Sequence, residues 1–306
     1  MKKTLSLIVL LLLALGMQAQ LLWKISGNGL QQPSYIIGTY HLAPVSFTDS
    51  IKGLKKAMDA SGQVYGEIIM ADMMSPENIQ KIQAAMMLPD GQTLDKLFTA
   101  DEMARVNTLL KNVMGVDMTH PIAAQQLGKM TPQALQTQLA AIMCLKKHPG
   151  FNPNESLDGY FQQQAVAKGK NVGAFETVDK QIEIMYKSST IDRQKEQLLC
   201  MADNQEFNEE IAENMIQAYF AQDIDAIKKV MDAKLNNSCD ATPAEEETLI
   251  YGRNDNWVKQ MPGIMKQKAT LFVVGAGHLP GERGVIAQLR KAGFTVEGVK
   301  CQHNQR

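Results

Sequence analysis

The first ninety residues alternate between two hydrophobic patterns. Short runs rich in β-branched and aromatic residues, "LLWKIS", "PSYIIG" and "QVYGEIIM", predict strands, and the turn-rich link between the first two predicts a hairpin. Apolar residues recur at helical spacing in residues 51–58, with Asp49 or Ser50 as the expected cap, and again in residues 76–87. This β-α-β-α order is typical of an α/β sheet.

The middle of the chain has a different pattern, and the end returns to the first one. Residues 94–168 and 178–262 predict mostly helices, separated by a short strand, "NVGAFE". The tail then predicts strand, helix and strand in "ATLFVVGAG", "ERGVIAQLRKAG" and "FTVEGV". We therefore predict an α/β (α+β) fold, in which both chain ends form a central mixed sheet (residues 20–90, 170–177 and 268–300) that carries a large helical insertion. Residues 20–306 are expected to form a single domain.

The N-terminus has the composition of a targeting segment. Two lysines precede an apolar run from Leu5 to Leu15, and a polar stretch follows that ends at Ala19. This run is too short for a comfortable membrane span, so residues 1–19 predict a cleaved secretory signal peptide. No cysteine lies there to carry a lipid. We expect an exported protein, periplasmic or secreted, without a stable membrane anchor after cleavage.

Charge and cysteines narrow the function further. The formal net charge of the chain is −1, with acidic and basic residues well mixed, which argues against a nucleic-acid partner. In an exported protein the four cysteines, Cys144, Cys200, Cys239 and Cys301, could form two disulfides, with three connectivities open, and we expect each of them to be buried or bridged. None of them belongs to a C-x-x-C pair, which argues against thiol redox chemistry and a zinc ribbon.

One strand-to-histidine pattern occurs twice, in "YIIGTYHLAP" and "FVVGAGHLPG". His41 and His278 each lie three residues beyond a glycine, Gly38 or Gly275, which we expect to permit a sharp exit with unusual backbone angles. Loops at the carboxyl ends of parallel strands converge, so neighbouring strands would bring both imidazoles to one crevice. Glu67 follows a third strand. Two imidazoles and a carboxylate suit a divalent metal, and the absence of H-E-x-x-H excludes the zincin helix.

These motifs, together with "LDGYF", "GKNVGAFETVDKQ" and "YGRNDNW", resemble the TraB/GumN family. This family includes the eukaryotic Tiki proteins and is distantly similar to erythromycin esterases and ChaN-like proteins. The resemblance extends over nearly the whole mature chain. It implies an erythromycin esterase/ChaN-like fold and a metallopeptidase-like hydrolase that uses manganese, cobalt or zinc on a peptide or small-molecule substrate.

The resemblance also implies a site. His41, His278 and Glu67 would be the metal-binding set, with Glu67 as ligand or general base. The arginine of "YGRN", Arg253, would bind a carboxylate or stabilise an oxyanion, and the acid of "AFET", Glu176, would orient a histidine ring.

Three alternatives remain open at this stage. A metal-free route would use a histidine as general base with a carboxylate behind it, as proposed for the esterase relatives. A non-catalytic protein would bind a peptide or small ligand in the same cleft. Arg253 and Glu176 are explained equally by an ion pair that joins the helical insertion to the sheet. The other three histidines, His120, His148 and His303, lie in loop or tail sequence and receive no role.

Overall fold

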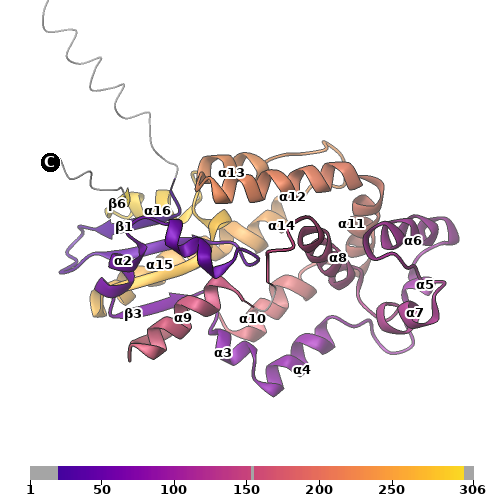
Figure 1. The fold of residues 1–306 in the computed structure, drawn as a ribbon, viewed down its shortest axis with the longest axis horizontal. Coiled ribbons are helices and arrows are strands. Elements are labelled where there is room, and N and C mark those ends of the chain that lie inside the picture. The colour runs from indigo at the N-terminus through magenta and orange to yellow at the C-terminus, as the bar shows by residue number, and fades with distance from the viewer. Residues whose placement is uncertain (1–19, 153–154, 300–306) are drawn as a thin grey trace, which may run out of the picture.

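The computed structural model describes residues 20–152 and 155–299, and its centre is one six-stranded mixed sheet (Figure 1). The strand order is β4-β3-β5-β2-β1-β6. The first four strands in this order run parallel, and β1 is antiparallel to both β2 and β6. The strands are β1 (Leu22–Ser26), β2 (Ser34–Thr39), β3 (Gln63–Gly66), β4 (Asn171–Ala174), β5 (Thr270–Gly275) and β6 (Thr295–Gly298). The predicted fold class is confirmed, because both chain ends contribute to this sheet and most helices lie between them.

The helices divide into those that pack on the sheet and those that lie beyond it. Helix α9 packs on β3, β4 and β5, and α16 packs on β6 and α15. Those of the sheet half are α2 (Leu54–Ala60), α9 (Leu157–Ala167), α15 (Gly252–Gln267) and α16 (Val285–Lys291). The others are α3 (Met70–Met73), α4 (Pro76–Ala85), α5 (Leu94–Leu97), α6 (Ala100–Met114), α7 (Pro121–Leu127), α8 (Pro132–Lys147), α10 (Val178–Ile182), α11 (Ile191–Asp203), α12 (Gln205–Phe220), α13 (Ile224–Met231) and α14 (Pro243–Glu246). Among these, α13 and the end of α12 also contribute buried residues to the core around the sheet.

Two hydrophobic cores hold these halves. The larger core lies around the sheet and includes Trp23, Phe161 and Trp257. The smaller core lies between α5, α6, α7, α8 and α11 and is built mainly from leucines such as Leu109 and Leu135. In Figure 1 the sheet lies on the left and the helical half on the right, beyond the carboxyl ends of the parallel strands. The helical insertion is therefore placed where it can cover a site at those strand ends. Whether residues 20–306 are one domain stays a prediction.

Some local predictions differ from the structure. Residues 45–50 form a 3-10 helix, and α2 begins only after Gly53, which has φ +78°, so neither Asp49 nor Ser50 caps it. The third strand ends at Gly66 and not in "EIIM", because α3 starts at Met70. The last helix ends at Lys291, shortly before Gly293, which has φ +90°.

The cysteines give one disulfide in the described part of the chain, Cys200–Cys239. Cys144 is buried and free, and its sulfur lies 3.7 Å from the Tyr40 hydroxyl. Its remaining partner in the two-disulfide prediction, Cys301, lies outside the described residues, as does the predicted signal peptide in residues 1–19. Within residues 20–152 and 155–299, no helix is both long and apolar enough to cross a membrane.

Candidate active site

The four parallel strands deliver the candidate residues to one edge of the sheet. Strands β2 and β5 are neighbours and parallel, with Gly38 opposite Val274 and Thr39 opposite Gly275. His41 and His278 leave this edge in equivalent positions. Glu67 follows β3 directly, and Glu176 lies two residues beyond the end of β4. The prediction that the two histidine strands lie side by side is confirmed.

Neither glycine of the two histidine motifs has the unusual backbone angles that we expected, and close packing requires a glycine only at Gly38. Gly38 does not have a positive φ, and Gly275 has φ −54°. A Cβ on Gly38 would lie 2.9 Å from both Ala276 Cα and Leu279 Cδ1. The turn after β5 therefore lies directly against β2, and only glycine leaves room for it. The backbone N–H of Gly275 has a further part, because it donates to Glu67 Oε1 at 2.8 Å.

His278 is buried, with only 6% of its side chain exposed. Its Nδ1 lies 2.7 Å from Asn254 Oδ1. The amide nitrogen of Asn254 donates to the carbonyls of His278 and Arg283, so its oxygen must be the acceptor and Nδ1 of His278 carries the proton. The lone pair is therefore on Nε2, which accepts from Arg253 Nη1 at 3.2 Å. Burial lowers the pKa of His278 to about 4 against the attraction of Glu67, so the ring is neutral at pH 7.

Arg253 joins the two carboxylates of the site. Its Nη2 donates to Glu67 Oε2, and its Nε and Nη2 donate to the two oxygens of Glu176 at 2.8 and 3.0 Å. Glu176 is only 3% exposed and also accepts from Trp257 Nε1 at 2.9 Å. Gln181 of α10 donates to both carboxylates. The ion pair between the insertion-side helix α15 and the sheet, expected on general grounds, is thus present.

Glu67 is held as a carboxylate. Burial would raise its pKa, but His278, which is protonated below about pH 4, the charge of Arg253 and the N–H of Gly275 outweigh burial and lower the pKa of Glu67 to about 2. Arg253 carries one positive charge against two carboxylates, and His278 is neutral. The cluster of Glu67, Glu176 and Arg253 therefore holds one negative charge in excess, at the end of the sheet where His278 presents a nitrogen lone pair.

His41 has the opposite environment. Its side chain is 74% exposed, and its Nδ1 lies 3.1 Å from Asp158 Oδ2 at the start of α9. Thr39 Oγ1 donates to the other oxygen of Asp158 at 3.0 Å, which fixes the carboxylate. The hydrogen bond to Asp158 raises the pKa of His41 to about 9, although partial burial opposes it. As an acceptor, the carboxylate directs the Nδ1 proton of His41 toward itself and leaves Nε2 facing away.

The donor chemistry of these residues suits a divalent cation. Each imidazole has its Nδ1 held by an oxygen acceptor, the arrangement that presents Nε2 to a metal, and Glu67 supplies a carboxylate. The residues do not stand as a closed metal centre, however. Within the described ranges no group of three or more His, Cys, Asp or Glu side chains is placed to hold a metal ion. The Arg253 guanidinium instead contacts both Glu67 and Nε2 of His278.

Two residues that hold the imidazoles were missed from the sequence, Asp158 and Asn254. Both lie in segments that carry the family resemblance, "LDGYF" and "YGRNDNW", and the need of a site histidine for an Nδ1 acceptor was the available signal. The expectation that Glu176 orients a histidine ring is wrong, because its oxygens bind Arg253, Trp257 and Gln181. His148 pairs with Glu213 and stacks on Phe151.

Comparison with known proteins agrees with the residue pattern. The model of the TraB/PrgY/gumN family matches residues 21–298. "Metalloprotease TIKI2" of Xenopus tropicalis is 26% identical over 307 residues, which cover 87% of this chain and 57% of that protein. "Metalloprotease TIKI1" of Danio rerio and of Homo sapiens are each 26% identical and cover 90% of this chain, but only 62% and 61% of those proteins.

This chain therefore spans about three-fifths of the length of the curated relatives it matches. No solved structure gives a significant match. The relatives' name implies a metal, and the two imidazoles and the carboxylate at one sheet edge are the residues of this chain that suit one. Because the family model covers nearly the whole described chain, the protein belongs to the TraB/PrgY/gumN family.

Proposed function

We propose that this protein is an exported, metal-dependent hydrolase that cleaves peptide bonds. One observation carries the proposal: two imidazoles leave the ends of adjacent parallel strands, and each has its Nδ1 held by an oxygen acceptor, which directs its Nε2 toward a ligand. At His278 a metal would take the place of Arg253, whose Nη1 now lies 3.2 Å from that Nε2. The relatives named metalloproteases support the peptide substrate, and the mixed, nearly neutral surface charge gives no support for a nucleic-acid partner.

In this proposal His41 and His278 hold the cation through Nε2, and Glu67 is the carboxylate of the set. The excess negative charge of the cluster around Arg253 attracts the cation electrostatically. A bound divalent metal would lower the pKa of its water toward neutrality and polarise the scissile carbonyl. His278 is already neutral at pH 7, whereas His41 must lose a proton before its Nε2 can bind a metal.

Arg253 supplies the fixed positive charge of the site. It is held by Glu67 and Glu176 and stacks on the ring of Trp257 at 4.8 Å, so its position is set before substrate arrives. A preorganised guanidinium can stabilise the oxyanion of a tetrahedral intermediate or bind a substrate carboxylate.

The test is metal content followed by cleavage. The mature chain without a histidine tag is loaded with manganese, cobalt or zinc, dialysed and analysed by mass spectrometry, beside His41→Ala, His278→Ala and the control His120→Ala. We expect about one metal per chain in the parent and the control, and loss of it in both site variants. A peptide panel then identifies activity that a chelator removes and added metal restores. No retained metal in the parent protein would overturn the proposal.

One specific observation favours a second candidate, a metal-free hydrolase. The exposed His41 with Asp158 behind it has the arrangement of a general base oriented by a carboxylate, and Arg253 contacts the Nε2 of His278. That enzyme would cleave esters or peptides in the presence of a chelator, lose activity in His41→Ala, and bind no metal. The same two measurements therefore separate the candidates.

A further inference from the structure

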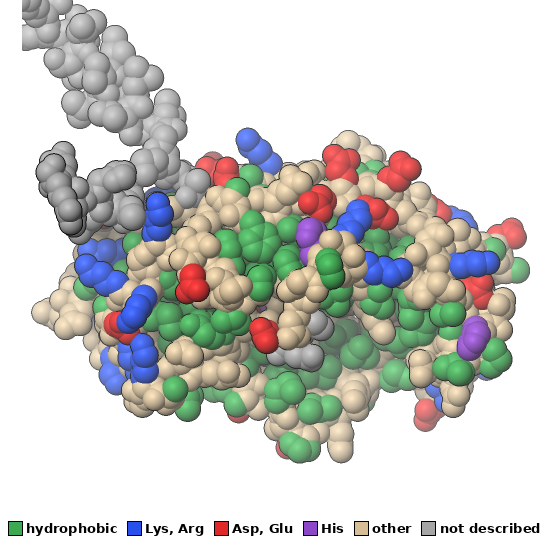
Figure 2. All heavy atoms as spheres, viewed as in Figure 1, with side chains coloured by type: hydrophobic (Ala, Val, Ile, Leu, Met, Phe, Trp, Pro, Cys, Tyr) green, Lys and Arg blue, Asp and Glu red, His purple; other side chains and the backbone are tan. Residues whose placement is uncertain are grey.

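A pocket of about 240 Å³ lies in the helical half, between two helices that come from the candidate site. Its walls include Ile184, Met185 and Leu249, and its floor includes the buried amide of Gln194. Figure 2 shows one face of the molecule, on which hydrophobic side chains gather around a hollow near the middle. The pocket itself is defined by the residues that line it. Met185 and Leu249 are each 38% exposed, so both are accessible from solvent.

Both walls of this pocket are π-helical. The described part of the chain has two π-helical segments, η2 (Glu183–Lys187) and η3 (Glu247–Tyr251), which contact each other, and both line this one pocket. A π-turn holds an extra residue, strains the helix and is found frequently at functional sites. Two π-helical segments at one pocket therefore indicate that the pocket has a function, such as ligand binding.

Each π-helical wall continues directly into the charged cluster. Gln181, four residues before Met185, donates to Glu67 and Glu176. Arg253, four residues after Leu249, donates from Nη1 to the Leu249 carbonyl at 3.3 Å. One helical turn is about 5.4 Å, so the pocket begins roughly that far from the cluster. A side chain one or two residues along a bound extended peptide can reach that far, since successive residues are about 3.3–3.4 Å apart.

The lining favours an apolar occupant. The one charged side chain in it, Glu245, is bound by two nitrogens of Arg193 at 2.8 and 3.1 Å, so it offers no free charge. The amide nitrogen of Gln194 donates to the Tyr186 and Ser189 carbonyls. The volume is below the roughly 300–1,000 Å³ of pockets that hold whole ligands. It exceeds the about 150 Å³ of an apolar cavity that binds benzene, so it fits one large side chain.

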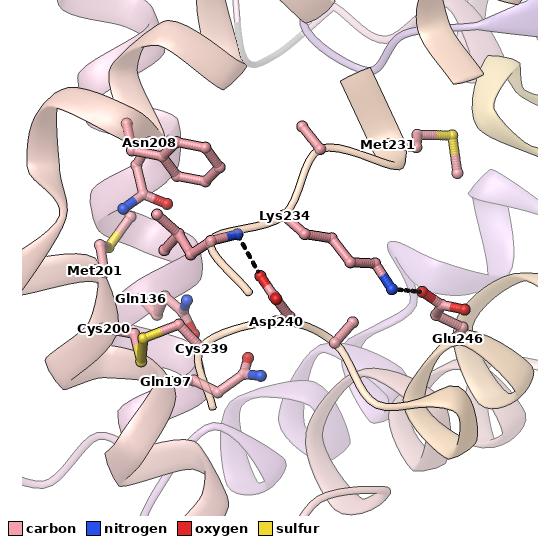
Figure 3. A pocket seen from close by; sticks show the side chains of 14 residues that line it. Gln136, Gln197, Cys200, Met201, Asn208, Met231, Lys234, Cys239, Asp240 and Glu246 are labelled. Carbon is pink, nitrogen blue, oxygen red and sulfur yellow. Dashed lines mark hydrogen bonds and ion pairs between the residues drawn. A yellow bond between two sulfur atoms is a disulfide. The ribbon is translucent and has the colours of Figure 1, made fainter. Parts of the chain in front are cut away.

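A neighbouring pocket of about 190 Å³ has different chemistry (Figure 3). It shares Gln197 and Ala241 with the first pocket but is lined by the Cys200–Cys239 disulfide, by Lys234 with Glu246, and by Asp240. Asp240 accepts from the backbone of Leu235, so its carboxylate holds the loop that the disulfide closes. Gln136 also lines this second pocket, and its Oε1 is buried without a hydrogen-bond partner. The lining is therefore polar and charged, and it carries no argument for an apolar ligand.

We infer that the pocket between η2 and η3 is a specificity subsite that takes one large apolar side chain, aliphatic or aromatic, of a peptide substrate beside the scissile bond. This inference rests on the proposed function as far as it concerns peptide cleavage. Binding of an apolar side chain in the pocket does not depend on cleavage and can be measured separately.

The test uses Leu249→Trp, which fills the pocket, and the matched control Val116→Trp, since Val116 is similarly exposed at 37% but lies elsewhere on the helical half. Peptides with one position varied are cleaved by the parent protein and both variants. We expect a preference for Leu, Met or Phe at one position next to the cleaved bond. Leu249→Trp should lower kcat/KM for those peptides about tenfold or more while changing it little for Gly and Ala peptides, because one methylene in an apolar pocket is worth about 10–200-fold.

A second measurement keeps the two proposals separable. Saturation-transfer NMR with N-acetyl-phenylalaninamide and N-acetyl-lysinamide reports binding without cleavage. We expect the parent and Val116→Trp to bind only the phenylalanine probe, and Leu249→Trp, if folded by circular dichroism, to bind neither. Absence of cleavage with this binding pattern would remove the proposed function and retain the pocket. Cleavage whose side-chain preference is the same in Leu249→Trp, or equal binding of both probes, would overturn the subsite.

Discussion

His41 and His278 occupy equivalent positions after neighbouring strands, yet their surroundings are opposite. His41 is exposed, pairs with the carboxylate of Asp158 and has a raised pKa. His278 is buried, pairs with the neutral amide of Asn254 and has a lowered pKa. The difference comes from helices outside the motifs: α9 brings Asp158 to one ring, and α15 brings Asn254, Arg253 and Trp257 to the other. The repeated sequence motif thus sets the position of each histidine, while the residues that α9 and α15 bring to it set the pKa of its ring.

The largest loss of stability should follow from breaking the buried ion pairs of Arg253 beside His278. Replacing Arg253 with alanine leaves Glu176 and Glu67 buried without their main partner, which costs about 3–5 kcal/mol when one member of a buried pair is removed. We expect the free energy of unfolding, measured with urea, to fall by that amount.

The matched control is Arg283→Ala. Arg283 also binds two carboxylates, Glu247 and Asp255, but all three side chains are 40% or more exposed. Exposed pairs contribute about 0–1 kcal/mol. Equal losses in the two variants would show that burial of the Arg253 cluster does not set its energy.

The two histidines should give stability slopes of opposite sign with pH. Between about pH 6.5 and 4 the unfolded chain binds a proton that neutral, folded His278 does not, so stability falls as pH falls through this window. At 1.36 kcal/mol per pKa unit the loss approaches about 3 kcal/mol. His41 acts in the other direction: its contribution is complete below pH 6.5 and is lost as pH rises toward about 9.

Urea unfolding of the metal-free protein from pH 4.5 to 9 measures both slopes. Solvent screens the exposed His41, so the alkaline slope should be the smaller one. In His278→Ala the acid slope should shrink, since the titrating ring is gone; an unchanged slope would assign acid sensitivity to other groups, Glu67 included.

The sequence predicted that the two histidines lie at one edge of the sheet, but it did not predict their different hydrogen-bond partners. Strand patterns and the doubled Gly-x-x-His placed both rings at one sheet edge, because the carboxyl ends of parallel strands meet there. Asp158, the partner of His41, lies more than a hundred residues away in the sequence. Asn254, the partner of His278, lies on helix α15, which precedes the strand that leads to His278. Periodicity does not state which turn of a distant helix faces a strand end. The need for glycine at position 38 was misjudged in the same way, because it comes from close packing against Ala276 and Leu279, which lie far along the chain.

Exchanging the hydrogen-bond partners of the two histidines should bring their pKa values closer together. Asp158→Asn removes the carboxylate whose hydrogen bond raises the pKa of His41, so that pKa should fall toward 6.5. Asn254→Asp places a carboxylate against His278 Nδ1, so that pKa should rise. Both shifts should be about 1–2 pKa units, and solvent screening should make the shift of the exposed His41 the smaller one. Imidazole NMR titration is practicable because the chain has five histidines. Unmoved pKa values would show that burial alone sets the contrast.

The smallest effect on stability should come from the residue with the largest expected effect on function. His41 is exposed and its hydrogen bond joins an accessible ring to Asp158, so His41→Ala should change the free energy of unfolding by less than about 1 kcal/mol. His278→Ala removes a buried ring that packs 4.5 Å from Trp257 and holds Asn254, and should cost about 2–4 kcal/mol. Both variants should lose metal and cleavage. Loss of function in His41→Ala at unchanged stability would separate chemistry from folding at this end of the site, whereas a large stability loss would mean that the Asp158 pair serves mainly to attach α9 to the sheet.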